Sequence, residues 1–383
     1  MDEKFLGTEY TGYDRELYRK IKSCWDGVAK PLDGMGRFET VLSRIGAIQG
    51  RLTPDVKKAR LIVCCADNGI VEEGVSQCGQ EVTAVCAENI ANGRSSVAIM
   101  ARQGDVDLLC VDMGINKEGK IPGVLDRKVR RGTRNFWKEP AMTEDEALRA
   151  IEIGMELVKT SKEEGYPILG IGEMGIGNTT TSSAITAALL RVPAELVTGR
   201  GAGLSDAALE RKRAIITEAL IRYGFQTEFG NAQEMVRKVG IELGDKKEPE
   251  KEELQGMKKE LALKALTTMG GYDIACMAGI CIGGAKYHVP IVLDGFISLV
   301  AALVACRLEP LVGEFLIASH SGKEPAMKLI EEELGLTPVI YANMALGEGT
   351  GAVLMLQLLR TANAVYEESI SFDGAGIQQY ERF

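Results

Sequence analysis

Short apolar segments that end in a polar or glycine-rich motif recur along this chain of 383 residues, and they constrain its fold more than any other feature. Helical patterns lie between several of them; one begins with the capping box Thr143-x-x-Glu146 and ends near Gly165. Apolar strands that alternate with helices indicate an α/β fold with a mainly parallel sheet covered on both faces. We expect strands at residues 61–65, 107–111, 167–171, 289–293, 314–318 and 338–341.

Each expected strand is followed by a polar motif. The carboxyl ends of parallel strands share one edge of the sheet, where ligands bind, so these motifs should converge on one site. Each motif alone could be an ordinary turn, because turns favour Gly, Asp and Asn, but six together favour a binding site. The motifs are DNG (67–69), DMG (112–114), GEMGIGNTT (172–180), DG (294–295), SHS (319–321) and LGEGTG (346–351).

The motif at residues 172–180 is typical of an anion site at the start of a helix. Its glycines let the backbone approach a phosphate, and the helix N-terminus and the hydroxyls supply donors. It is neither a Walker loop nor a dinucleotide fingerprint. A second glycine-rich turn, residues 198–203, precedes Ser205, which we expect to cap a helix. Arg200 and Lys212 are candidate cations, although helical lysines usually face solvent.

The composition excludes several classes of partner. Acidic residues outnumber basic ones by 54 to 45, and the net charge of −9 predicts neither a nucleic-acid nor a membrane partner. The first residues lack the pattern of a signal peptide, and the longest apolar run, 289–305, contains Asp294. Nine cysteines, several in apolar runs, predict reduced core thiols. We therefore expect a soluble, cytoplasmic protein.

The chain divides by composition into unequal parts. Residues 1–50 are helical and polar and predict the first part of a small helical domain. Residues 51–360 form the expected large α/β catalytic domain, and residues 361–383 a C-terminal tail that joins the small one. Within the large domain, the charged segment 245–260 predicts a solvated excursion or an exposed helix.

Few residues suit metal or nucleophilic chemistry. The chain has only two histidines, His288 and His320, and no Cys-x-x-Cys pair, so we expect no metal and no cofactor. Two serines flank His320, but nothing resembles a nucleophile elbow. Acid–base chemistry in this chain would therefore fall to a carboxylate.

The motifs together resemble the nicotinate-nucleotide–dimethylbenzimidazole phosphoribosyltransferase family, in family order from about Lys30 to the last helix. The combination of GEMGIGNTT with LGEGTGA is the most specific part of this resemblance. The matching segments are KPLDGMGRFE (30–39), ADNGIVEEGVS (66–76), GEMGIGNTT (172–180), GRGAGLSD (199–206), GGYDIACMAG (270–279), VPIVLDGF (289–296), ASHSGKEP (318–325) and LGEGTGA (346–352).

The resemblance implies a Rossmann-like sheet with a small helical domain, in a dimer, and a reaction. An aromatic base attacks C1′ of nicotinate mononucleotide, nicotinate leaves, and the product is an α-glycoside used in cobalamin assembly. The resemblance places the general base at Glu348 and a second site carboxylate, catalytic or positioning, at Glu173. It implies a nucleotide and phosphate site at Gly175, Ile176, Gly177, Asn178, Thr179, Thr180, Gly201, Gly203 and Lys212, and a pocket for the acceptor base at Ser76, Val85, Met174 and Leu346. Asp294 and Ser319 are weaker candidates.

The acceptor pocket departs from the family pattern. Val85 stands where the family often has a glutamine, and the segment ASHSGKEP lacks a common arginine. An apolar wall at Val85 could suit another base, and relatives that activate phenol or p-cresol work as pairs of unlike paralogous subunits. Glu348 would serve a phenolic acceptor as well. A benzimidazole-type base is the leading expectation, in a homodimer or a heterodimer with a paralogue.

Two further hypotheses belong to other classes. The chain could be a non-catalytic partner subunit, although Glu348 and Glu173 are both present and a pure partner needs no base. A dehydrogenase is disfavoured because no expected strand is followed by a dinucleotide fingerprint.

Overall fold

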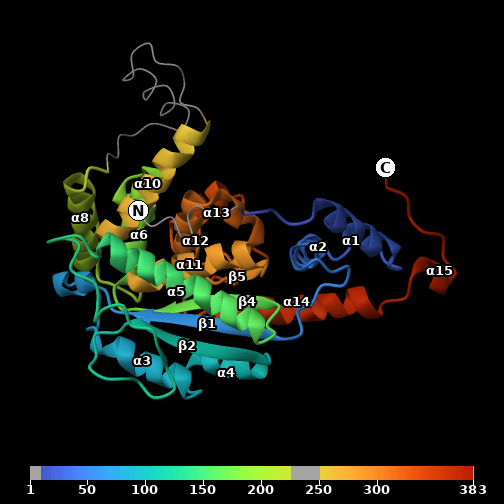
Figure 1. Ribbon diagram of the computed structural model, residues 1–383, viewed down its shortest axis with the longest axis horizontal. Helices are drawn as coiled ribbons and strands as arrows, with labels where there is room; N and C mark the ends of the chain where they lie inside the picture. Colours follow the sequence, from blue (N-terminus) through green and yellow to red (C-terminus); the bar gives the residue numbers. More distant parts are fainter. Residues whose placement is uncertain (1–9, 226–250, 383) are drawn as a thin grey trace, which may run out of the picture.

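A single parallel sheet forms the centre of the molecule in a computed structural model, which describes residues 10–225 and 251–382 (Figure 1). In these residues the strand order is β3-β2-β1-β4-β5-β6, and every neighbouring pair is parallel. The chain reverses its direction of travel across the sheet between β1 and β4, as in Rossmann-like folds, which bind ligands at such a point. The strands are Ala59–Ala66, Val106–Gly114, Leu125–Asp126, Ile168–Met174, Ile291–Leu293 and Leu316–Ala318, for β1 to β6.

Helices connect the strands and cover the sheet. The α-helices of the described residues are α1 (Arg15–Gly27), α2 (Arg37–Gln49), α3 (Glu81–Ala91), α4 (Ser96–Gln103), α5 (Glu144–Glu163), α6 (Asn178–Leu190), α7 (Ala194–Val197), α8 (Asp206–Arg222), α10 (Lys251–Met269), α11 (Tyr272–Tyr287), α12 (Phe296–Leu308), α13 (Met327–Leu334), α14 (Thr350–Glu368) and α15 (Phe372–Ala375). Short 3-10 helices lie at Gly69–Glu73 and Pro310–Phe315. Among the helices of residues 10–225 and 251–382, none combines the length and the hydropathy needed to cross a bilayer.

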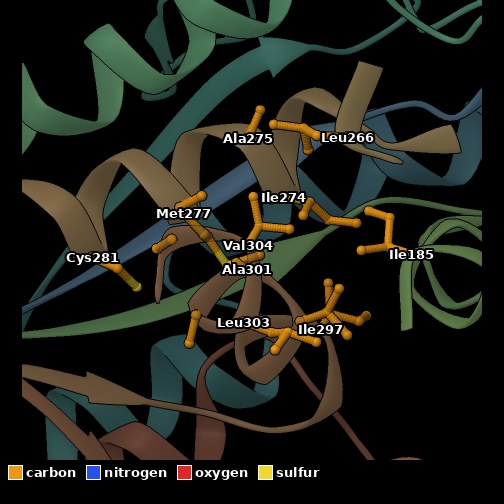
Figure 2. Close-up of a cluster of buried hydrophobic side chains, with 14 of the residues drawn as sticks. Ile185, Leu266, Ile274, Ala275, Met277, Cys281, Ile297, Ala301, Leu303 and Val304 are labelled. Atoms are coloured by element: carbon orange, nitrogen blue, oxygen red, sulfur yellow. The ribbon is translucent and has the colours of Figure 1, made fainter. Parts of the chain in front are cut away.

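The core lies on both faces of the sheet, because successive side chains of a strand point to opposite faces. In β1, Ile62 and Cys64 join the apolar cluster with α5, α6, α10, α11 and α12. Leu61 and Val63 join the cluster with α1 to α4 and α14. Figure 2 shows part of the first cluster, where Ile274 of α11 faces side chains of α12 and α6. This arrangement confirms the expected α/β fold.

Two glycines let α5 and α11 pack closely against each other. A Cβ on Gly154 of α5 would overlap the carbonyl oxygen of Cys276, and one on Gly279 of α11 would overlap that of Ile151. The capping box of α5 forms as expected, with the Thr143 side chain accepting from the Glu146 N–H. Ser205 likewise caps α8. The glycine-rich composition thus serves helix packing as well as the turns.

Helices α1, α2 and α15 lie together to the right of the sheet in Figure 1. Val28, after α1, forms an isolated bridge with Ser371, just before α15. Arg382 pairs with Asp26 and Asp33 near α1, with N–O distances of 2.7 and 2.8 Å. The apolar side of α1 and α2 contributes Ile21, Trp25, Leu42 and Ile45 to the same cluster as β1 and α14. The division into domains at residues 50 and 360 stays a prediction.

The predicted strands differ from the observed ones in four places. Residues 338–341 form no strand but a single bridge between Ile340 and His320, and residues 314–315 end a 3-10 helix. Strand β2 is longer than expected and includes Asp112 and Gly114, because its pairing with β1 continues to its end. The short strand β3 was not predicted, since its two residues are exposed and carry no apolar run. Residues 251–260 begin α10, and 245–250 lie outside the described residues.

Candidate active site

A cavity of about 290 Å³ lies at the carboxyl ends of β4, β5 and β6. Five segments that are distant in sequence line it, and they include four of the six polar motifs; residues 67–69 and 112–114 do not line it. The five segments are residues 173–179, 201–202, 294–298, 320–327 and 344–348, and Cys86 of α3 joins them. A smaller cavity of about 90 Å³ adjoins it along residues 175–179 and includes Ser76, Gln77, Gly177 and Arg200.

The turn between β4 and α6 brings backbone to the boundary of the two cavities. Gly177 has a φ of 91°, and a Cβ there would overlap Val71 Cγ2, so both its conformation and its surroundings require glycine. Helix α6 begins directly after it without a side-chain cap. Gly175, Ile176, Asn178 and Thr179 line both cavities. Thr180 instead points into the protein: it is fully buried, lines neither cavity, and its hydroxyl has no hydrogen-bond partner.

Asn178 connects two buried carboxyl groups beside this turn. Its Nδ2 donates to Glu173 Oε2 and, at 3.0 Å, to Asp273 Oδ2. Burial and the nearby Asp273 raise the pKa of Glu173 to about 8, and burial also raises the pKa of Asp273 to about 6. Near neutral pH, Glu173 is therefore mostly protonated, which suits a hydrogen-bond donor better than a base.

Glu348 lies in a backbone turn with left-handed conformations at three successive residues. The φ angles of Gly347, Glu348 and Gly349 are 82°, 61° and 94°. This turn packs against β4 so closely that a Cβ on Gly172 would overlap the Glu348 carbonyl oxygen. Burial raises the pKa of the Glu348 carboxyl, and the Val97 N–H at the start of α4 opposes that rise. Its Oε2 is buried without a hydrogen-bond partner.

Asp294 anchors the same turn from the end of β5. Its two oxygens accept hydrogen bonds from the N–H groups of Gly349, at 3.0 Å, and Gly351, at 2.7 Å. His320 lies beside it, since a Cβ on Gly351 would overlap the His320 ring. Burial raises the pKa of Asp294 and lowers that of His320, and their mutual attraction opposes both shifts. Asp294 thus acts on the position of Glu348.

Lys212 reaches the turn after β4 from α8. Its side chain is fully buried, and its Nζ donates to Thr179 Oγ1 at 2.9 Å and to the Gly199 carbonyl at 3.3 Å. Burial lowers the pKa of the Lys212 amine to about 8, and Glu324 opposes this shift. Gly201 lines the larger cavity, whereas Gly203 lines neither and accepts from Gln77 through its carbonyl.

The residues predicted for the acceptor pocket fall into three positions. Met174 and Leu346 line the larger cavity, and Ser76 lines the smaller one. Val85 lines neither; its side chain is 57% exposed, while the next residue, Cys86, faces the cavity. Helical geometry turns adjacent residues by about 100°, so Val85 and Cys86 face different sides of α3, and the place of Val85 in the acceptor pocket stays a prediction.

Sequence reasoning gave no role to several groups that the fold brings to this site. Asp273 resembles an ordinary acid in the first turn of a helix, and His320 was considered only as part of a triad. Lys323 and Glu324 also line the cavity. The signal available was that all four lie in motifs shared with one family, three of them after or near a strand end.

An acidic cluster and a surface hollow lie elsewhere in the described residues, and the charged side chains in both are paired with one another. In the part of the chain that the structure describes, Asp26, Asp33 and Glu39 come close enough to hold a metal ion. Each carboxylate is paired with a cation, Arg382, Lys22 or Lys30. A hollow of about 650 Å³ beside Tyr366 contains the pairs Arg51–Asp55 and Lys57–Glu367.

The chain matches known proteins over nearly its whole length. A family model described as a phosphoribosyltransferase matches residues 11–244 and 250–377. A nicotinate-nucleotide–dimethylbenzimidazole phosphoribosyltransferase of Clostridium perfringens is 38% identical over 377 residues, which cover 98% of this chain and 95% of the relative. The chain belongs to this family.

Other members of the nicotinate-nucleotide–dimethylbenzimidazole phosphoribosyltransferase family agree with this assignment. The enzyme so named from Geobacter metallireducens is 38% identical over 367 residues, or 96% of this chain and 95% of the relative. The crystal structure of CobT from Thermus thermophilus superimposes with a TM-score of 0.81 and 35% identity, over 95% of this chain and all of that one. This chain is therefore a phosphoribosyltransferase with the fold of that family.

Proposed function

We propose that this enzyme transfers the phosphoribosyl group of nicotinate mononucleotide to a benzimidazole-type base, releases nicotinate and forms the α-glycoside used in cobamide assembly. The observation that carries the proposal is a single cavity that joins Glu348, Glu173 and the glycine-rich turn at 175–179. The names of the relatives support the same substrates.

The donor phosphate binds at the turn that precedes α6. Backbone N–H groups at a helix start and the hydroxyl of Thr179 suit a phosphate. Lys212 supplies the positive charge through its contact with Thr179. These groups hold the ribose so that C1′ faces the acceptor base between Met174 and Leu346, and this alignment supplies much of the rate enhancement.

The acceptor nitrogen attacks C1′ on the face opposite nicotinate. As the new C–N bond forms, the bond to nicotinate breaks and its electron pair leaves with nicotinate, so the configuration inverts from β to α. The azole ring becomes cationic, and Glu348 accepts the proton from its other nitrogen. Its unpartnered Oε2 is the free acceptor for this step. General-base catalysis of this kind contributes about 10²–10⁴ in rate.

Glu173 positions the Glu348 turn. Its carboxyl lies against Gly347 and the Glu348 N–H, and its raised pKa keeps it protonated near neutral pH. The reaction therefore uses one base, Glu348, and one neutral hydrogen-bonding carboxyl, Glu173. Asn178 fixes the orientation of that carboxyl.

The names of the relatives favour dimethylbenzimidazole over a phenolic acceptor, and the presence of Glu348 and Glu173 in one cavity favours an enzyme over a non-catalytic partner subunit. We further propose a dimer of identical chains that acts in the cytoplasm. Nine free cysteines support a reducing location.

The test uses the purified chain alone with nicotinate mononucleotide. Dimethylbenzimidazole, adenine and phenol are supplied in parallel, and nicotinate release and the α-glycoside are followed by chromatography. We expect turnover with dimethylbenzimidazole that Glu348→Gln reduces by about 10²–10⁴. Turnover with phenol alone would replace the acceptor, and no turnover with any base would reject a stand-alone enzyme.

A further inference from the structure

A carboxylate of the protein itself, Glu324, lies against the second glycine-rich turn, in the same cavity as the proposed phosphate site. Glu324 lies against Gly199 so closely that a Cβ on the glycine would overlap Glu324 Oε2. The backbone N–H of Gly201 also faces this carboxyl group. Oε2 is buried and has no hydrogen-bond partner, so it is held there without a direct donor of its own.

The same turn contacts the cation and the hydroxyl of the proposed phosphate site, which belong to α8 and α6. Thr179 Oγ1 would lie 2.9 Å from a Cβ on Gly201, and it accepts from Lys212 at 2.9 Å. The other acceptor for Lys212, the Gly199 carbonyl, is also uncharged. Glu324 is the carboxylate whose charge acts on this buried amine. Thr179, Gly199, Gly201, Lys212 and Glu324 therefore form one cluster, here called the anion cluster.

We propose that Glu324 is an internal anion that holds the anion cluster in the nucleotide-free enzyme, and that the phosphate of the donor displaces its carboxylate. This inference rests on the proposed function. A buried lysine is costly without a nearby negative charge, so Glu324 stabilises the empty site. A phosphate dianion at Thr179 and Gly201 would meet that carboxylate in a region of low dielectric, where like charges repel strongly.

The alternative is a fixed counter-ion, in which Glu324 stays beside Lys212 when the donor is bound. The two readings predict opposite effects of removing the charge. A displaceable anion competes with phosphate, so its removal tightens phosphate binding. A fixed counter-ion keeps Lys212 charged and in place, so its removal leaves phosphate binding unchanged or weakens it.

The first experiment measures the dissociation constants of inorganic phosphate and of nicotinate mononucleotide by calorimetry for the full chain. For Glu324→Gln we expect both ligands to bind about tenfold more tightly than to the unmodified chain, because one competing charge is gone. Glu332→Gln is the matched control, since it removes the same charge from an exposed residue of α13. Unchanged or weaker phosphate binding by Glu324→Gln would overturn the proposal.

A second experiment uses only the unmodified chain, so its result does not depend on whether a variant folds. Crystal structures of the unmodified chain with and without inorganic phosphate show where Glu324 points in each. We expect the carboxylate against Gly199 without phosphate and turned into the larger cavity with it. A carboxylate that stays against Gly199 while phosphate contacts Thr179 would refute displacement.

Nicotinate release separates this inference from the proposed function. If the unmodified chain releases nicotinate but Glu324→Gln binds phosphate no more tightly, only the displacement is wrong. If no acceptor supports release while Glu324→Gln binds phosphate tenfold more tightly, the anion cluster stands and the proposed reaction is wrong.

Discussion

Asp294 Oδ1 accepts a hydrogen bond of 2.7 Å from the backbone N–H of Gly351, and this contact joins the end of β5 to the first turn of α14. Its other oxygen accepts from Gly349. The two bonds hold the backbone directly after Glu348, a residue with a φ of 61°. Left-handed conformations cost a non-glycine residue roughly 1–2 kcal/mol, so the strained position of the proposed base depends on a carboxylate from another strand.

Replacing Asp294 by Asn should therefore disturb the position of Glu348, although the substitution leaves Glu348 itself unchanged. The amide offers one acceptor where the carboxylate offered two, and its NH₂ group faces a backbone N–H. We expect the free energy of unfolding to fall by about 1.5–3 kcal/mol, because charge-assisted hydrogen bonds are lost, and the melting temperature to fall with it. We also expect a reduced kcat. Calorimetric unfolding and nicotinate release measure the two effects. A variant with the stability and kcat of the unmodified chain would show that the turn is held by other contacts.

Glu348→Gln removes the proposed base while keeping its size. We expect kcat to fall by about 10²–10⁴ with little change in the dissociation constant of nicotinate mononucleotide, because the carboxyl acts on the acceptor and not on the donor. Steady-state kinetics and calorimetry give the two quantities. Glu367→Gln, on the same loop-and-helix segment but away from the cavity, is the control. Equal kcat for both variants would assign the proton transfer elsewhere.

Glu173 should make the protein less stable as the pH rises. Its pKa in the folded chain is about 8 against an ordinary value of 4.5, so the folded state holds a proton that the unfolded state has lost. Stability therefore falls between about pH 4.5 and pH 8. Glutamine cannot titrate, so we expect the melting temperature of Glu173→Gln, relative to that of the unmodified chain, to rise steadily across that range. A constant difference from pH 4.5 to pH 8 would contradict the raised pKa.

Met174 and Val85 test the acceptor pocket. Met174 lines the cavity, whereas Val85 is mostly exposed beside it. Truncation of a side chain against an apolar ligand costs about tenfold or more, so Met174→Ala should raise the KM for dimethylbenzimidazole about tenfold. Val85→Ala should change it less than about twofold by the same reasoning. Initial rates at saturating donor give both values, and a larger effect at Val85 would mean that its side chain contacts the base.

The alternation of apolar strands and polar motifs was enough to predict the sheet and the edge where the site lies. Five of the six strands follow from apolar runs with polar ends. Strand β3 depends on tertiary pairing and carries no local signal. Segment 338–341 has the apolar pattern of a strand, but Ile340 pairs only with His320, because strand pairing is decided by tertiary structure.

The sequence predicts those parts of the candidate site in which a motif determines the backbone conformation. It does not predict those parts in which a residue's role depends on whether the fold buries it. The turn at 175–179 follows from its glycines and the helix after it. The role of Asp273 does not, because nothing local distinguishes a buried acid beside Glu173 from a solvated one in a first helical turn. Glu324 is a similar case, since its closeness to Gly199 joins segments more than a hundred residues apart.

Helix α14 begins two residues after Glu348 and ends at Glu368, and near its end Tyr366 packs against Trp25 of α1 in a tilted arrangement with ring centroids 4.8 Å apart. Its 19 residues span about 28 Å as one stiff rod. Near the middle of this helix, Arg360 donates a hydrogen bond of 2.6 Å to the Asp105 carbonyl. Because α14 is stiff, a small tilt of α1 and α2 would move the turn that holds Glu348. Substitutions far from the cavity can therefore alter proton transfer without changing any residue that lines it.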